Sequence, residues 1–242
     1  MANRQQKQAA KAVRRRQAVA VKRQAERQAS SPASRIAAAA AGPVERCLRS
    51  ADMAEAGIAH VILARRLESG ALGCGFFLVD LLCLGVKDAF YREVAPSDLD
   101  DRVAEMAADA QPMVAVDPAS AKKLILGAVA FAAGCGMDPA KDYRTVMRLF
   151  DGVDAGTSSE SFAFGRDGTA VYIPGPKDSM SRMRDVERRL RRALGEDGWD
   201  FDVPGRDRAV LRNIVEALDR ERGARDGGLV IEHDGETEPR HG

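Results

Sequence analysis

The chain lacks a long apolar run, an ordered cysteine pattern and a large aromatic content. No stretch of its 242 residues approaches the roughly 20 consecutive apolar side chains that a membrane-spanning helix needs. The four cysteines, at positions 47, 74, 83 and 135, form neither a disulfide framework nor a CxxC metal knuckle. Aromatic residues make up only 5%, which argues against a surface that stacks nucleic-acid bases. We therefore expect a soluble, cytoplasmic protein with no membrane partner.

The three histidines offer little material for a catalytic base or a zinc site. His233 and His241 lie in a polar tail, and His60 stands alone in a strand-like run, where we interpret it as an ordinary sheet residue. Cys83 and Cys135 are embedded among Leu, Ala and Gly, a setting typical of small core side chains. No GxSxG, HExxH, GxxxxGK[ST] or dinucleotide-binding fingerprint occurs in its required context, so these enzyme classes lack support.

What the sequence does contain is a strong charge asymmetry. Residues 1–36 hold ten Lys or Arg and one acid, Glu26; the whole chain has 37 basic and 36 acidic residues, so 27 and 35 remain for the rest. Because the segment has almost nothing to bury and consists of good helix formers, we expect a basic arm, largely disordered alone and helical on a polyanion. An Arg-rich, acid-poor start is also typical of an organellar transit peptide. The residues expected to bind nucleic acid are Arg4, Lys7, Lys11, Arg14, Arg15, Arg16, Lys22, Arg23 and Arg27.

The chain divides by composition into three parts. Residues 1–43 are the basic arm and a linker, residues 44–222 are a single α+β domain, and residues 223–242 are a polar C-terminal tail. Hairpins and helices without regular β-α-β alternation favour an α+β body over a doubly wound sheet. We expect two β-hairpins packed with about five helices.

The expected elements follow from apolar spacing and turn residues. Apolar runs over residues 58–67 and 72–86 flank a Glu-Ser-Gly turn and predict the first hairpin. The second run is almost continuously apolar, which indicates a strand covered on both faces, and we expect it to be the central strand. A Gly-Arg-Asp-Gly turn between residues 162–164 and 170–173 predicts the second hairpin. Capping residues predict helices that begin near residues 97, 117, 138, 178 and 207.

Asp80 is the sharpest chemical feature, because a carboxylate inside a strand covered on both faces loses hydration unless something satisfies it. One interpretation is a structural acid bonded to a buried base or to backbone donors, with no need of a cofactor. The other joins Asp80 to Asp88 as catalytic ligands of a divalent metal, with Lys87 placed to contact phosphate. Mg²⁺ or Mn²⁺ would then support phosphodiester hydrolysis by polarising the phosphate and generating hydroxide.

A second candidate site lies at the start of the helix predicted near residue 178. Lys177 and Ser179 stand where the first backbone N–H groups of that helix favour an anion such as phosphate. Turn chemistry explains the same residues without a ligand, since Asp178 or Ser179 can cap the helix. The outer face of this helix is rich in arginine but diluted by Asp185 and Glu187, so it is either a solvated face or a second nucleic-acid contact.

Three blocks of the sequence are distinctive as strings. They are FLVDLLCLGVKD at residues 77–88, KLILGAV at residues 123–129, and FGRDG with YIPGPKDS at residues 164–168 and 172–179. Over residues 55–200 the chain resembles a family of uncharacterised bacterial proteins that carries such blocks. The resemblance implies a bacterial cytoplasmic body and assigns no catalytic roles.

Taken together, these patterns predict an accessory protein of nucleic acid, RNA or the ribosome in particular. It would bind polyanions without sequence preference through the basic arm. Two alternatives stay open: a metal-dependent phosphodiesterase or nuclease that uses Asp80 and Asp88, and a protein-protein interaction module with a protein partner. The sequence does not decide whether the protein is an enzyme.

Overall fold

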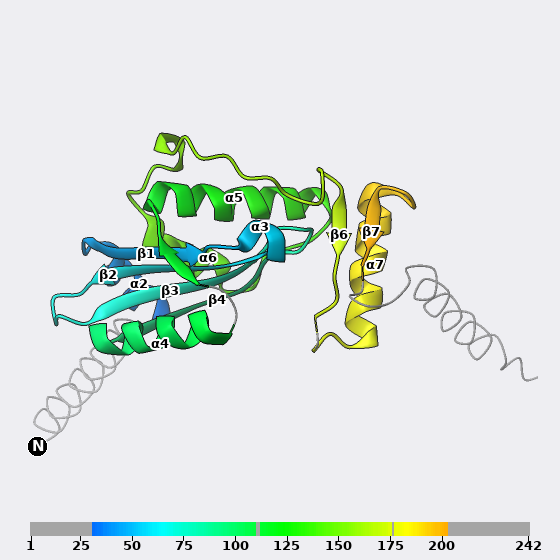
Figure 1. The fold of residues 1–242 in the computed structure, drawn as a ribbon. Helices are drawn as coiled ribbons and strands as arrows, with labels where there is room; N and C mark the ends of the chain where they lie inside the picture. Colours follow the sequence, from blue (N-terminus) through cyan, green and yellow to red (C-terminus); the bar gives the residue numbers. More distant parts are fainter. Residues whose placement is uncertain (1–30, 110–111, 176, 203–242) are drawn as a thin grey trace, which may run out of the picture.

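Five antiparallel strands form the main sheet, in the order β4-β3-β2-β1-β5, and helices cover both of its faces (Figure 1). The structure is a computed structural model that describes residues 31–109, 112–175 and 177–202. The predicted α+β class is confirmed. The strands of this sheet are β1 (Val44–Ser50), β2 (Ile58–Arg66), β3 (Leu72–Asp80), β4 (Gly85–Val94) and β5 (Met113–Ala115).

The helices of the described residues are amphipathic segments or short turns that pack on the strands. They are α2 (Pro32–Ala40), α3 (Met53–Ala56), α4 (Pro96–Asp109), α5 (Pro118–Gly134), α6 (Tyr143–Val146) and α7 (Met180–Leu194), with 3-10 turns η1 (Met147–Phe150) and η2 (Ala155–Thr157). Local capping explains where three of them begin. The side chains of Ser31, Asp117 and Ser179 accept hydrogen bonds from the first free backbone N–H groups of α2, α5 and α7.

Both faces of β2 and β3 are covered. Alternate residues of these strands point to opposite sides of the sheet, and each side packs in a core of its own. Val61 and Phe77 pack in the core beneath α2, α5, α6 and η1. Ile62 and Phe76 pack with Leu99 of α4 on the other face. Figure 1 shows α5 and α4 on opposite sides of the strands. The prediction that the run beginning at residue 72 is covered on both faces is thereby confirmed.

The predicted hairpin over residues 58–86 is confirmed as β2 and β3, but two of its details are wrong. The apolar run does not continue as one strand to residue 86: β3 ends at Asp80, and the chain turns into β4 at Gly85. Gly85 has φ of 65°, and a Cβ built there would lie 2.7 Å from the Cβ of Ala132 in α5. The central strand is β2 rather than β3, because β1 and β5 extend the sheet beyond β2.

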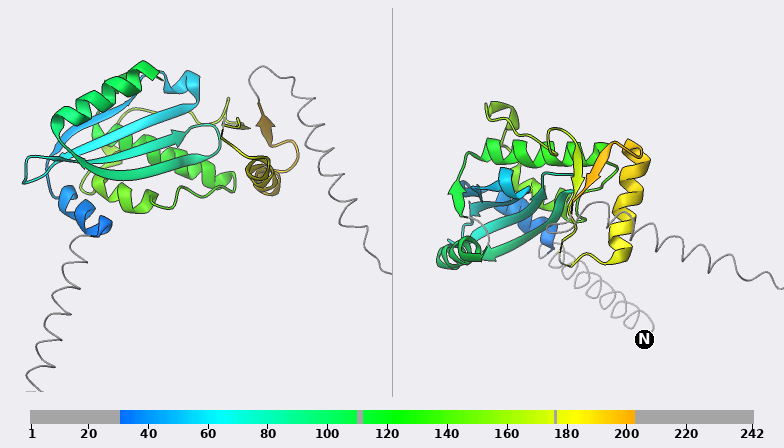
Figure 2. Two further views of the ribbon diagram at one scale, coloured as in Figure 1. Left: turned by 90° about the horizontal axis from the view of Figure 1, so that it is seen from below. Right: turned by 45° about the vertical axis from the view of Figure 1, so that its right-hand side comes forward.

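A small second unit, which we call the α7 unit, consists of β6 (Ala170–Tyr172), α7 and β7 (Trp199–Phe201). It stands at one end of the main sheet, as the two views of Figure 2 show. The predicted second hairpin is wrong: the Gly-Arg-Asp-Gly turn forms one bridge, Arg166 to Thr169, and β6 pairs in parallel with β7 instead. The main sheet still holds two hairpins, β2 with β3 and β3 with β4.

The turn between β3 and β4, residues 81–84, joins the α7 unit to the sheet. The carbonyl oxygens of Leu81 and Leu82 accept hydrogen bonds from the backbone N–H groups of Gly165 (2.8 Å) and Val171 (3.2 Å). The next two side chains of the turn, those of Cys83 and Leu84, belong to the core of the α7 unit, which also includes Tyr172, Val186 and Leu190. One short turn therefore serves two hydrophobic cores.

The N-terminal boundary of the packed body lies earlier than residue 44. Ile36 and Ala39 of α2 are fully buried in the main core, so residues 32–40 are a packed helix rather than a linker. The helix predicted near residue 138 begins only at Tyr143 and lasts four residues before η1. The predicted arm up to residue 30, the helix near residue 207 and the polar tail lie outside the described residues.

A buried arginine fastens the loops at the edge of the core. Arg65 of β2 is 7% exposed. Its guanidinium donates to the carbonyl oxygens of Leu149 (2.7 Å), Gly42 (2.7 Å) and Asp151 (2.8 Å). Three backbone acceptors thus satisfy a cation whose burial lowers its pKa.

Candidate functional site

Asp80 is buried at the end of β3 and binds backbone donors. Only 6% of the residue is exposed. Its Oδ1 accepts hydrogen bonds from the backbone N–H groups of Leu82 (3.0 Å), Cys83 (2.9 Å) and Leu84 (3.0 Å). This arrangement matches the structural interpretation of Asp80, in which one carboxylate oxygen organises the turn between β3 and β4.

Lys87 and Asp88 lie in different surroundings. The register of β3 and β4 shifts between Leu78, which lies opposite Asp88, and Val79, which lies opposite Val86, so Lys87 is the extra residue of a β-bulge. Asp88 lines a pocket under α4, and Lys87 lines a pocket beside α7. The three predicted catalytic residues therefore face a turn and two separate pockets. Within residues 31–109, 112–175 and 177–202, no group of three or more His, Cys, Asp or Glu side chains could hold a metal ion.

The pocket beside α7 gathers the residues with the clearest chemistry. We call it the α7 pocket; its volume is about 440 Å³. It opens between the start of β4, the loop after α5 and the start of α7. The residues that line it include Lys87, Met137, Asp138, Asp178, Arg182 and Arg189.

Both acids of the α7 pocket already have partners. Asp178 accepts hydrogen bonds from the Tyr172 hydroxyl (3.0 Å) and the Gly175 N–H (2.9 Å). Burial is the main cause that raises the pKa of Tyr172, and the negative charge of Asp178 is the second. The phenol therefore stays protonated and acts as a hydrogen-bond donor. Asp138 pairs with Arg189, whose guanidinium lies 3.2 Å from the Asp138 carboxylate.

Two cations of the α7 pocket have no such partner. Neither Lys87 nor Arg182 forms an ion pair or a side-chain hydrogen bond with another residue that the structure describes. Their charges stand close to the positive end of α7, which has 15 residues and whose first backbone N–H groups favour an anion. The pocket therefore presents unneutralised positive charge in a concave, partly apolar surface.

The predicted anion-binding residues have different roles at this helix start. Ser179 is the N-cap, and its Oγ accepts a hydrogen bond from the Arg182 N–H (3.2 Å). Lys177 is exposed in the preceding turn. Of the segment 177–179, only Asp178 lines the α7 pocket with Lys87, so the structure does not place the two predicted anion-binding side chains in its lining. The proximity of Asp178 to Lys87 is one that sequence reasoning missed.

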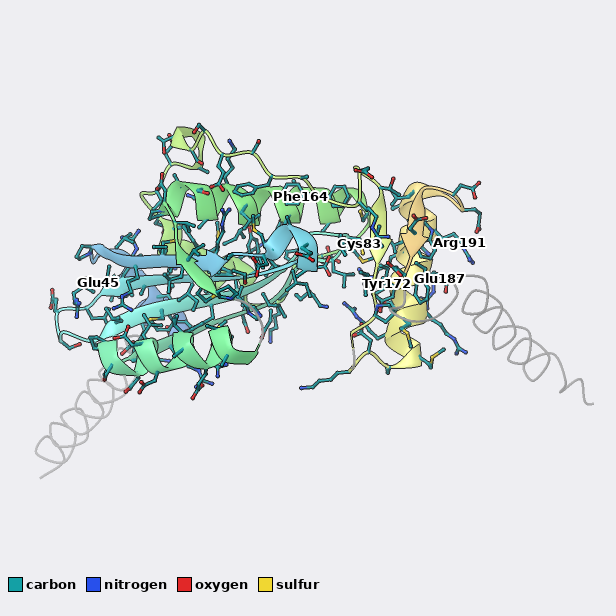
Figure 3. All side chains as sticks on the ribbon, in the orientation of Figure 1. Glu45, Cys83, Phe164, Tyr172, Glu187 and Arg191 are labelled. Atoms are coloured by element: carbon teal, nitrogen blue, oxygen red, sulfur yellow. The ribbon has the colours of Figure 1, made fainter. Side chains whose placement is uncertain are left out.

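Several arginines of α7 pair with acids of the same helix or of the residues just after it. Arg191 lies 2.9 Å from Glu187 and 3.1 Å from Glu196, and Arg188 lies 3.4 Å from Asp185. Figure 3 labels Glu187 and Arg191 on this helix. These pairs reduce the field that the face presents, which favours the interpretation of a solvated face.

The two cysteines and the histidine that the sequence predicts to be structural lie in different surroundings. Cys83 and Cys135 are buried thiols with pKa values raised by burial, so they are core side chains as predicted; Cys83 lies at the junction with Tyr172 (Figure 3). His60, predicted to be an ordinary sheet residue, lines the pocket under α4 together with Asp88. Only strand register could have revealed that proximity, because 27 residues separate the two positions.

Comparisons with known proteins add no assignment. No protein-family model, curated protein or solved structure matches the chain. The resemblance to a bacterial family therefore stays a prediction. In the described part of the chain, none of the helices combines the length and the apolar character required to cross a bilayer.

Proposed function

We propose that the protein associates with nucleic acid, RNA or a ribosome in particular, through the basic arm and through one phosphate held in the α7 pocket. The observation that carries the second contact is the pair of unpartnered cations, Lys87 and Arg182, beside the start of α7. Lys87 supplies a point charge, and the planar guanidinium of Arg182 can donate two parallel hydrogen bonds to phosphate oxygens. Such contacts position a backbone and carry no sequence information.

Salt dependence makes the proposal quantitative. Nine of the ten basic residues in the segment 1–36 precede residue 31. If about five of them neutralise phosphates, log K falls with log salt at a slope of roughly −4, because each contact releases counterions. A phosphate in the α7 pocket adds about −1 to that slope.

The test is a titration of the full chain with a labelled single-stranded RNA of mixed sequence, followed by fluorescence anisotropy at several salt concentrations. Lys87→Gln with Arg182→Gln should weaken binding about fivefold and make the slope less steep by about 1. The matched control is Arg144→Gln with Arg148→Gln, which removes the same charge from exposed positions of α6 and η1. Equal affinities and slopes for the pocket variant and the control would refute the pocket contact.

The arm is tested separately by a truncation placed with the help of the structure. Deletion of residues 1–36 would remove Ile36 from the main core, whereas deletion of residues 1–30 leaves α2 and its Ser31 cap in place. The shorter deletion should abolish most binding at low salt and leave thermal stability unchanged. Undiminished RNA binding by this variant would contradict the role of the arm.

The two alternatives have less support. Metal-dependent phosphodiester hydrolysis requires Asp80 and Asp88 to share an ion, but Oδ1 of Asp80 already binds three backbone donors and Asp88 lines the separate pocket under α4. A protein-interaction module that docks its partner on an apolar surface would present a contiguous exposed apolar patch. The large exposed apolar side chains of the described residues are dispersed over β4, β5, α5 and α7. We therefore prefer the polyanion proposal to both.

A further inference from the structure

A second pocket, under α4, is lined by apolar and polar side chains that suit a small ligand. We call it the α4 pocket; it has a volume of about 280 Å³ and lies between α4 and the strands β2, β3 and β4. An apolar cavity of about 150 Å³ is enough to hold benzene. The α4 pocket therefore has room for one aromatic ring and a short polar arm.

The strand register explains which side chains meet there. His60 of β2 lies opposite Leu78 of β3, and Leu78 lies opposite Asp88 of β4. Residues directly opposite each other in antiparallel strands project from the same face, so all three point toward α4. Helix α4 contributes Arg102 and Met106 from above.

The interior of the α4 pocket is apolar. Ile62 and Phe76 lie at its base and are buried, 0% and 8% exposed. Phe90, at the outer side, is 39% exposed and stacks on Phe76 with ring centroids 4.8 Å apart. A ligand that enters from solvent thus passes the polar groups at the rim before it meets aromatic and aliphatic carbon in the interior.

The charges around the α4 pocket leave one carboxylate without a partner. Arg102 pairs with Glu105 at 3.1 Å, so the two charges contributed by α4 offset each other. His60 is neutral at physiological pH, because burial and the nearby Arg102 lower its pKa. Asp88 has no ion pair or hydrogen bond with another described side chain, and it is exposed at the rim. In a neighbouring cavity on the far side of Phe90, Asp98 and Arg92 contribute opposite charges.

We propose that the α4 pocket binds a small organic amine, with the apolar body of the ligand on Ile62, Phe76 and Met106 and its ammonium group on the Asp88 carboxylate. Phe90 contributes only to the apolar wall, because its ring stacks on Phe76 and the guanidinium of Arg92 lies over it, 5.5 Å from the ring centroid. The neutral His60 imidazole adds a hydrogen-bond partner without repelling the cation. This site is independent of the α7 pocket, so its test and that of the polyanion proposal can fail separately.

The test uses three probes that share a phenyl ring and a two-carbon arm: phenethylamine, phenethyl alcohol and phenylacetate. Each is titrated into the full chain while the NMR signals of the His60 ring and of the methyl groups of Ile62 and Met106 are followed. We expect the amine to bind tightest and phenylacetate weakest. Asp88→Asn should weaken binding of the amine about fivefold to tenfold and leave binding of the alcohol unchanged.

A matched control is Glu68→Gln, which removes one exposed carboxylate from the β2–β3 loop. It should leave the affinities for all three probes unchanged. Thermal unfolding of each variant verifies that the fold persists. Preferential binding of phenylacetate that is lost in Arg102→Gln would overturn the proposal in favour of an anion site. Absence of His60 shifts with every probe, or equal affinity of wild type and Asp88→Asn for the amine, would also overturn it.

Discussion

Replacement of Asp80 separates its structural role from a role in metal binding. In Asp80→Ala, three backbone N–H groups lose their acceptor, and two of them belong to the buried residues Cys83 and Leu84. An unsatisfied buried donor costs about 1–3 kcal/mol, so the loss from the two buried donors should be about 2–6 kcal/mol, a large part of the stability of a typical domain. Asp80→Asn retains an oxygen at the same place but loses the charge assistance, which should cost about 1–2 kcal/mol.

The assay is urea unfolding followed by tryptophan fluorescence. Trp199 is the one tryptophan of the chain and is 5% exposed in the core of the α7 unit, where Cys83 and Leu84 also pack. Its emission therefore reports on the region that the turn supports. The measurement is repeated with excess Mg²⁺ and Mn²⁺, because a metal that binds only the folded protein raises its stability by mass action.

Two results would refute the structural role. One is Asp80→Ala as stable as the wild type. The other is a wild type that Mg²⁺ or Mn²⁺ stabilises and an Asp80→Asn variant that neither metal stabilises. That second pattern would restore Asp80 as a metal ligand. Asp88→Asn serves as the control, since it removes a carboxylate from the predicted pair without disturbing the turn.

Three further predictions concern stability. Arg65→Met should destabilise the protein by about 3–5 kcal/mol in urea unfolding, because three carbonyl oxygens lose a buried donor. Equal stability of variant and wild type would contradict this role of Arg65. Gly85→Ala should lower the thermal midpoint by several degrees, because the new methyl group would clash with Ala132 and because the backbone of residue 85 has a positive φ. An unchanged midpoint would show that the contact relaxes freely. The lowered pKa of His60 means that the folded state prefers the neutral ring. The contribution of the neutral ring to stability is complete above the unfolded pKa of about 6.5 and is lost as pH falls below it. The stability difference between wild type and His60→Gln should therefore change between pH 7 and pH 5. A constant difference would argue against burial of the ring.

Local features of the chain could be predicted from sequence because local chemistry decides them. Asp117 before Pro118 and Ser179 before α7 mark helix starts with side-chain acceptors, and both helices begin there. The need of Asp80 for hydrogen-bond donors also follows from its apolar neighbours. Which donors satisfy it depends on a turn that the apolar pattern of residues 81–84 conceals.

Features that depend on distant pairing could not be predicted in the same way. β1 and β4 mix charged and apolar residues, since much of β4 is exposed, so neither has a clean strand pattern. β6 takes its partner from β7, beyond a whole helix, and not from the adjacent residues 162–164. The α7 pocket has the same origin, because 95 positions separate Lys87 from Arg182 and only the tertiary fold unites them.

The turn between β3 and β4 has a consequence for how the molecule opens. Its backbone oxygens bind the segment that leads into β6, and its side chains complete the core beneath α7. The core of the α7 unit therefore loses two of its buried side chains when that turn detaches. Amide hydrogens of β6, α7 and residues 82–84 should exchange with solvent as one cooperative group, at a common opening free energy, while those of β2 persist longer.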